Sequence, residues 1–120
     1  MSQEEQDRRI DYIEFAVVDL QQAKRFYATV FGWSFTDYGS DYTSFADGRL
    51  SGGFSRAETL QPGGPLVVVY ALDLEQVEAA VVAQGGAIVK ETFSFPGGRR
   101  FHFRDPSGYE LAVWSDQERA

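Results

Sequence analysis

The feature that most constrains this chain is one structural pattern that occurs twice at a fixed spacing. The segments DLQQAKRFYATVFGW and DLEQVEAAVVAQGGA both open on Asp-Leu, and Asp73 follows Asp19 by 54 residues. Gly86 follows Gly32 by the same interval. Each aspartate is a typical helix N-cap, and each glycine is a typical residue at which a helix ends. The spacing therefore predicts two tandem copies of one supersecondary unit.

Short segments that alternate apolar and polar residues surround both helices, which is typical of strands with one buried face. One such strand, within IDYIEFAVVDL, precedes the first helix, and PLVVVYALDL supplies another before the second. Three more are predicted after each helix, at 33–38, 42–46 and 50–56, and at 88–92, 99–104 and 109–114. The sequence thus predicts an α+β fold of two βαβββ modules in one domain spanning 1–120. Module one covers about 9–58, a Gly/Pro-rich linker 59–65, and module two about 66–116.

Charge and composition exclude several functions. The 120-residue chain has a net charge of −7, which disfavours nucleic acid or an anionic membrane as a partner. It has no cysteine, so disulfides and thiol nucleophiles are excluded. The start MSQEEQDRRI lacks the apolar core of a signal peptide, and no apolar run is long enough to span a bilayer. We expect a cytoplasmic protein whose partner is a neutral or cationic small molecule.

The segments VVDLQQAKRFYATVFGW, ALDLEQVEAAVVAQGGAIV and FHFRDPSGYELAVW make the chain similar to the vicinal oxygen chelate superfamily. That superfamily includes glyoxalase I, extradiol dioxygenases, fosfomycin-modifying thiol transferases and bleomycin resistance proteins. The resemblance covers roughly Ile10 to Asp116 and is greatest to small glyoxalase-like proteins related to lactoylglutathione lyase. It implies curved sheets that form a cup, helices on the convex face, and a homodimer with two cups.

The resemblance also implies where metal ligands would stand. The corresponding positions here are Tyr12, Val67 and Ala112, while Gly52-Gly53 leaves the fourth position without a register. Valine and alanine have no lone pair to donate, and a neutral tyrosine is a poor ligand for a divalent ion. Glu58 is expected beyond the end of its strand. We therefore expect no metal and no cofactor.

Alternation assigns faces to the strands. On the register that the resemblance suggests, one set of residues faces the cup: Tyr12, Glu14, Ala16, Val67, Val69, Ala71, Glu110, Ala112 and Trp114. The opposite set is more apolar and should meet the helices: Ile13, Phe15, Val17, Val68, Tyr70, Leu72, Leu111 and Val113. The residues expected to be buried are Phe15, Phe26, Leu72, Leu74, Val81, Phe103, Leu111 and Val113. Trp33 is expected to pack the first helix against its sheet, and the Gly52-Gly53 and Gly97-Gly98 pairs to form bulges or turns.

His102 is the only histidine, and it lies between two phenylalanines that suit the core. Alternation then turns Arg100, His102 and Arg104 toward the cup, where His102 meets Glu110 only if the DPSG loop leaves an odd number of residues unpaired. Such a group could be an acid/base set. Alternatively, His102 and Arg100 could pair with Glu110 and Glu14 in structural contacts, which is the favoured interpretation.

Two functions are consistent with these residues. The first is a metal-free small-molecule-binding protein of the glyoxalase and bleomycin-resistance type, with Tyr12, Val67, Arg100, Ala112 and Trp114 contacting the ligand. The alternative is a lyase or isomerase related to lactoylglutathione lyase, in which His102 works with Glu14 or Glu110 as acid and base.

Overall fold

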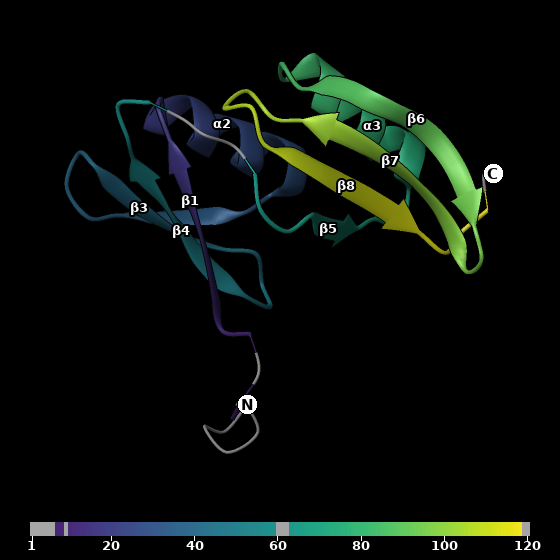
Figure 1. The fold of residues 1–120 in the computed structure, drawn as a ribbon, viewed down its shortest axis with the longest axis horizontal. Coiled ribbons are helices and arrows are strands. Elements are labelled where there is room, and N and C mark those ends of the chain that lie inside the picture. Colours follow the sequence, from purple (N-terminus) through teal and green to yellow (C-terminus); the bar gives the residue numbers. More distant parts are fainter. Residues whose placement is uncertain (1–6, 9, 60–62, 119–120) are drawn as a thin grey trace.

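The computed structural model describes residues 7, 8, 10–59 and 63–118. These residues form two four-stranded sheets, and one helix follows the first strand of each sheet (Figure 1). None of the described helices is both long enough and apolar enough to cross a membrane. The α+β fold with two βαβββ units is confirmed.

Sheet A is built by the first unit. Its elements are β1 (Tyr12–Val17), α2 (Leu20–Phe31), β2 (Ser34–Asp37), β3 (Tyr42–Ala46) and β4 (Ser51–Arg56). The strand order is β1-β4-β3-β2, and β1 runs parallel to β4 while the other neighbours are antiparallel. The parallel pair follows from α2, since a helical crossover returns the chain in its original direction.

Sheet B repeats this arrangement. Its elements are β5 (Val67–Tyr70), α3 (Leu74–Ala83), β6 (Ala87–Phe95), β7 (Gly98–Arg104) and β8 (Glu110–Ser115), in the order β5-β8-β7-β6. Strand β6 is longer than the predicted 88–92, because it continues through Phe95 into the tight turn at Gly97, which has φ 111°. Both predicted helices begin where expected: the side chains of Asp19 and Asp73 accept hydrogen bonds from the backbone amides of Gln22 and Gln76.

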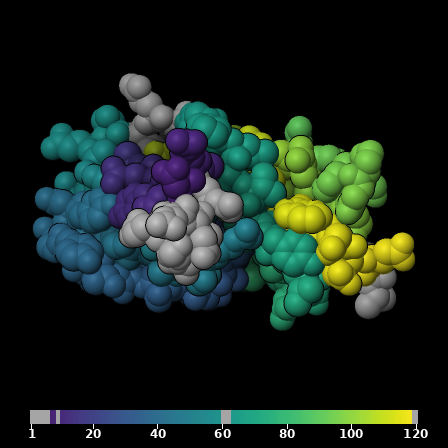
Figure 2. Space-filling model, turned by 90° about the horizontal axis from the view of Figure 1, so that it is seen from below, coloured from purple at the N-terminus to yellow at the C-terminus, as the bar shows by residue number. Residues whose placement is uncertain are grey.

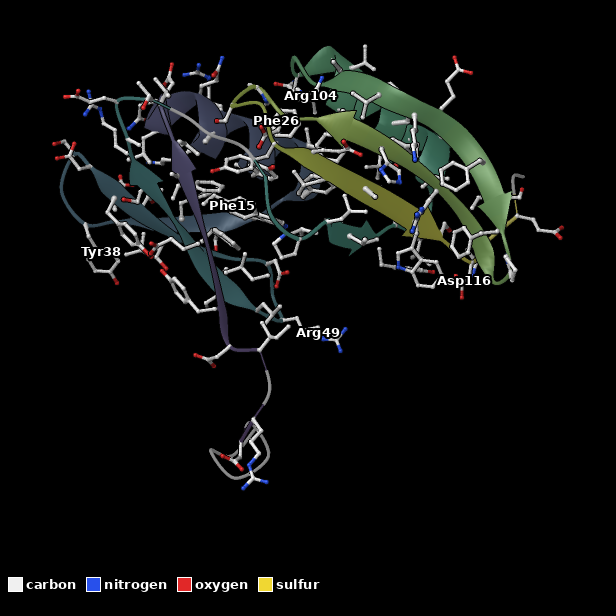
Figure 3. All side chains as sticks on the ribbon, in the orientation of Figure 1. Phe15, Phe26, Tyr38, Arg49, Arg104 and Asp116 are labelled. Atoms are coloured by element: carbon white, nitrogen blue, oxygen red, sulfur yellow. The ribbon has the colours of Figure 1, made fainter. Side chains whose placement is uncertain are left out.

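Helix α2 connects the two sheets through adjacent aromatic residues. Phe26, labelled in Figure 3, has its ring centroid 6.0 Å from that of Phe103 on β7. Tyr27 has its centroid 5.4 Å from Phe54 on β4 and stacks on Trp33 at 4.7 Å. Trp33 therefore packs the end of the helix, as expected. Because both sheets bury apolar area against one helix, the core is shared between the modules.

The expected core is confirmed with one exception. The side chains of Phe26, Leu74, Val81, Phe103, Leu111 and Val113 are at most 1% exposed, and Phe15 packs partly buried against them. Leu72, however, is 73% exposed, so its predicted burial is wrong.

The exposure of Leu72 has the same cause as a wider error on β5. Val67 pairs with Leu111 and Val68 pairs with Ala112 in the parallel ladder, so Val68 and Tyr70 share the face of Ala112 and Trp114. The assignment of Val67, Val69 and Ala71 to the cup face is therefore wrong: Val67 packs against the core instead. A shift of one residue exchanges the two faces of a strand, and the uniform VVV run gave no signal to fix the register.

Gly52 and Gly53 are not a bulge or a turn. Both lie inside β4 in continuous register with β1 and β3. A Cβ on Gly52 would collide with the carbonyl oxygen of Ile13 and the ring of Phe45, and one on Gly53 with the hydroxyl of Tyr42. These glycines therefore make room for side chains on both faces of sheet A. Gly97, in contrast, does lie in a turn.

Candidate functional site

The candidate site lies on the face of sheet B that is turned away from the helices, here called the open face of sheet B. In Figure 1, α3 lies behind β6, β7 and β8, so this face is toward the reader. The strand pairs place these residues on it: Val68, Tyr70, Phe93, Arg100, His102, Glu110, Ala112 and Trp114. Arg104 and Asp116, labelled in Figure 3, mark the two ends of the sheet.

His102 and Glu110 form the centre of this face. Imidazole Nδ1 lies 2.8 Å from carboxylate oxygen Oε2 of Glu110, and the His102 residue is only 3% exposed. The two residues share a face because the paired residues Arg104 and Glu110 enclose an odd number of loop residues, 105–109. Since a carboxylate accepts, Nδ1 must carry a proton, and the remaining ring nitrogen Nε2 is enclosed without a hydrogen-bond partner among the described residues.

Arg100 does not form an ion pair with Glu14, although the interpretation of these residues as purely structural contacts predicts one. No carboxylate of a described residue lies within 4.0 Å of its guanidinium nitrogens. The guanidinium carbon instead lies 5.3 Å from the ring centroid of Phe93 and 5.6 Å from that of Phe95, at cation–π distance. Arg100 is thus held by aromatic rings and keeps its charge unpaired within the described residues.

Trp114 extends the site with aromatic surface. Its ring lies edge-on to Tyr70 at 5.1 Å and 6.4 Å from Phe95. The Tyr70 hydroxyl donates a 2.6 Å hydrogen bond to Asp116, and this bond raises the pKa of Tyr70. The open face of sheet B therefore combines the guanidinium of Arg100 and one enclosed imidazole with a row of aromatic rings. Lys90, which pairs with His102, and Arg104, which pairs with Glu110, add positive charge to the same face.

Glu14 and Tyr12 lie on the other sheet. The Tyr42 hydroxyl donates a 2.9 Å hydrogen bond to Oε2 of Glu14, and the hydroxyls of Tyr12 and Tyr42 are hydrogen-bonded to each other over Gly53. The bond to Tyr12 is the main cause that raises the pKa of Tyr42. Among the described residues, no hydrogen bond joins Glu14 to His102 or Glu110. The structure thus brings together two of the three residues proposed as catalytic.

A broad cleft runs between the two modules. Figure 2 shows the modules as two lobes, purple to blue for the first and green to yellow for the second, with teal atoms of the β5 region between them. The cleft is lined by side chains from both modules, among them Glu14, Phe15, Val67, Tyr70, Glu110 and Trp114. Val67 therefore still reaches this cleft, although its side chain packs against the core.

The residues at the positions where the resemblance places metal ligands, Tyr12, Val67 and Ala112, do not fit a metal ion. Tyr12 lies on sheet A with its hydroxyl hydrogen-bonded to Tyr42. Val67 and Ala112 lie on opposite faces of sheet B, and neither has a donor atom. On sheet A, Gly53 lies next to Glu14, while Glu58 lies beyond β4, as expected. Within the described part of the chain, no three His, Cys, Asp or Glu side chains form a group that could hold an ion.

The turn Asp105–Gly108 holds Glu110 in place. Oδ1 of Asp105 accepts hydrogen bonds from the backbone amides of Ser107, Gly108 and Tyr109, and Oδ2 accepts one from the Tyr27 hydroxyl at 2.8 Å. This arrangement fixes the β7–β8 hairpin to helix α2. Burial raises the pKa of Asp105, although these four hydrogen bonds oppose the rise.

Sequence reasoning missed Phe93, Phe95, Tyr42 and Tyr70 as site residues. The alternation of Phe93 and Phe95 just before the turn PGG was a usable signal, because it extends β6 alongside Arg100. Tyr42 had no comparable signal, since its partner Tyr12 is 30 residues away and meets it only in the folded sheet.

Comparison with protein families gave a match to the model described as Glyoxalase/Bleomycin resistance protein/Dioxygenase superfamily, over residues 9–113. A search of curated proteins gave no match.

Several solved structures share the fold. A glyoxalase/bleomycin resistance protein/dioxygenase family enzyme from Burkholderia phytofirmans PsJN has a TM-score of 0.79 at 15% identity, over 90% of this chain and 100% of that one. A mutant of the fosfomycin resistance protein FosX from Listeria monocytogenes, with Mn(II) and dihydroxypropylphosphonic acid, has a TM-score of 0.78 at 17% identity, covering 89% of each chain. TioX from Micromonospora sp. ML1 has a TM-score of 0.71 at 20% identity, over 89% of this chain and 98% of that one.

Proposed function

Because the chain belongs to the Glyoxalase/Bleomycin resistance protein/Dioxygenase superfamily, we propose that it is a small-molecule-binding protein whose ligand lies on the open face of sheet B. The observation that carries the proposal is the combination there of Arg100, which has no carboxylate partner among the described residues, with the aromatic ring of Trp114. Unpaired polar groups beside apolar rings are typical of ligand sites.

A fluorescence titration tests this function. Trp114 is on the proposed site, whereas Trp33 is stacked in the core on Tyr27 and Phe45. A panel of anionic, neutral and cationic organic compounds is first screened by thermal shift, because a ligand of the folded state raises the unfolding temperature. Each hit should change the fluorescence of the wild type but not that of Trp114→Phe, in which Trp33 is the only tryptophan. A hit that changes both equally argues against this face.

The ligand charge expected from the sequence stays a prediction. The net charge of −7 favours a neutral or cationic compound, and on sheet A the carboxylate of Glu14 beside Tyr42 would support one. Sheet B carries the opposite local charge at Arg100. The panel must therefore contain all three charge classes.

We also propose that binding needs no metal ion. The support is the chemistry of Tyr12, Val67 and Ala112: valine and alanine have no donor atom, and a neutral tyrosine is a poor ligand for a divalent ion. Elemental analysis of protein purified without added metal tests this. Stoichiometric zinc, iron, nickel or manganese would contradict it.

A second candidate is acid/base catalysis, which one observation favours. With Nδ1 bound to Glu110, His102 has a fixed orientation and only Nε2 left to exchange a proton with a substrate. A lyase or isomerase reaction would then depend on His102 and Glu110, while Glu14 would have to come from elsewhere in an assembly. Turnover of a ligand from the panel, lost in His102→Gln, would establish this activity.

A homodimer stays part of the proposal. Strand β5 is an edge of sheet B and exposes Val68 and Tyr70, Leu72 is exposed just beyond its end, and β1 is an edge of sheet A. A second copy would cover these edges, which soluble proteins rarely leave bare. Light scattering coupled to size-exclusion chromatography should give twice the mass of the 120-residue chain. A monomer at micromolar concentration would reject the dimer.

A further inference from the structure

Three buried side-chain nitrogens lack a hydrogen-bond partner within the described residues: Nε of Arg99, Nε of Arg100 and Nε2 of His102. Arg99 is otherwise satisfied, because its terminal nitrogens bind Glu75 and the backbone oxygen of Gln117. Arg100 and His102 are two residues apart on β7 and therefore lie side by side on the open face of sheet B. An enclosed polar atom without a partner is unusual in a native protein.

The guanidinium group of Arg100 is positioned to bind a partner outside the described residues. Its Nε is enclosed, while its terminal nitrogens make no hydrogen bond to a described residue and are not among the buried unpartnered atoms, so they reach solvent. The rings of Phe93 and Phe95 hold the guanidinium group in place. A guanidinium held in this way matches the two oxygens of a carboxylate, because its N–H groups form a planar fork.

The surroundings favour a planar ligand. Phe93 borders both polar groups, with its centroid 5.3 Å from the guanidinium carbon and 5.9 Å from the imidazole ring. Phe95 and Trp114 continue this surface, and Trp114 pairs directly with Arg100 across the β7–β8 ladder. An aromatic ring attached to the carboxylate would stack against these side chains.

We propose that the open face of sheet B binds a small aromatic carboxylic acid, with its carboxylate on Arg100, its ring against Phe95 and Trp114, and a neighbouring hydroxyl at Nε2 of His102. This rests on the proposed small-molecule-binding function and assigns its ligand class. Because Glu110 occupies Nδ1, Nε2 is the ring nitrogen left for a ligand, and because this atom is enclosed, the hydroxyl reaches it only when the side chains around it move. The negative net charge does not oppose it, since distant surface charges are screened and the carboxylate contacts Arg100 directly.

Three compounds of the same size and shape separate the ligand charges: benzoate, benzamide and benzamidine, which are anionic, neutral and cationic. Calorimetric titration should give saturable binding of benzoate, tighter binding of 2-hydroxybenzoate, and at least about tenfold weaker binding of the other two. Arg100→Gln should weaken benzoate binding by about tenfold or more. Arg25→Gln is the control, because it removes the same charge from an exposed position of helix α2, away from this face, and it should change binding by less than about threefold.

The single histidine gives a second measurement. Ring resonances of His102 should shift when 2-hydroxybenzoate binds, and less with benzoate, which has no hydroxyl for Nε2. Thermal unfolding of each variant shows whether it is folded.

Each outcome decides between the two proposals. Equal or tighter binding of benzamide or benzamidine, or benzoate binding that survives Arg100→Gln, overturns the carboxylate assignment and leaves small-molecule binding intact. No saturation by benzoate or 2-hydroxybenzoate at millimolar concentrations also overturns it. Failure of the whole three-charge panel would instead reject the proposed function.

Discussion

Removing one hydroxyl group from the core tests how the β7–β8 turn is held. In Tyr27→Phe, Asp105 loses one of its four hydrogen-bond donors, while the ring contacts with Trp33, Phe26 and Phe54 remain. Tyr27 is 1% exposed and Asp105 is 6% exposed, so water cannot readily replace the lost bond. A hydrogen bond to a charged group is worth about 1.5–3 kcal/mol, and we expect that loss in the free energy of unfolding.

Urea denaturation at neutral pH measures this change, with a loss of melting temperature on the order of 5–15 °C as a second readout. Tyr38→Phe is the matched control, since Tyr38 is 65% exposed and its hydroxyl makes no hydrogen bond to a described residue. It should change stability by less than about 0.5 kcal/mol.

A double-mutant cycle with Asp105→Asn isolates the charge. In that background the Tyr27→Phe change should cost only about 0.5–1.5 kcal/mol, as for a hydrogen bond between neutral groups. If Tyr27→Phe is no more costly than Tyr38→Phe, or if its cost is unchanged by Asp105→Asn, the buried hydroxyl–carboxylate bond does not hold the turn.

Four further results are expected. Burial raises the pKa of Asp105, so the stability of the wild type relative to Asp105→Asn should be greatest below pH 4 and fall as pH rises through the folded-state pKa. The slope should be at most about 1.4 kcal/mol per pH unit. A relative stability that rises with pH would show that the hydrogen bonds outweigh burial. Phe103→Ala should lower the free energy of unfolding in urea by about 3–5 kcal/mol, because the ring is fully buried. Leu72→Ala should lower it by less than about 0.5 kcal/mol, because Leu72 is 73% exposed. Similar losses for the two variants would reject the β5 register. Gly52→Ala should destabilise by at least about 1–3 kcal/mol through its collision with the Ile13 carbonyl, while Gly63→Ala, which meets no atom of a described residue within 4 Å, should be nearly neutral. Nitrogen-15 spectra of His102 should show a protonated Nδ1; a neutral ring protonated only at Nε2 would contradict the bond to Glu110.

Local chemistry explains which parts of the fold were predictable. Asp19 and Gly32 fix the ends of α2 because capping involves atoms only a few residues apart. The alternation in β7 identified its buried face, since Phe103 stands between His102 and Arg104, and in β1 the large side chains of Phe15 and Val17 alternate with Glu14 and Ala16. For β5 the same reasoning failed. In a run of three valines both faces look alike, and only the pairing with Leu111 and Ala112 distinguishes them.

The candidate site divides in the same way. The sequence indicated Arg100, His102, Glu110 and Trp114, because strand alternation places residues on a face whatever they pack against. The contact between His102 and Glu110 depended on the number of unpaired residues in the β7–β8 loop. The structure leaves residues 105–109 unpaired, an odd number, so the two side chains share a face. The partners of Arg100 were not predictable, since Phe93 and Phe95 reach it across a ladder with irregular register.

The sequence by itself determined the two βαβββ units, the starts of both helices and the lack of donor atoms at Val67 and Ala112, because each depends on residue type and short-range spacing. Only the tertiary structure decided which partners the charged and titratable groups meet. Glu14 is bound by Tyr42, His102 by Glu110, and Arg100 by aromatic rings. The physical reason is that ion pairing depends on distances of a few ångströms between residues far apart in the chain, and these distances are set when the strands pair and the sheets pack against α2.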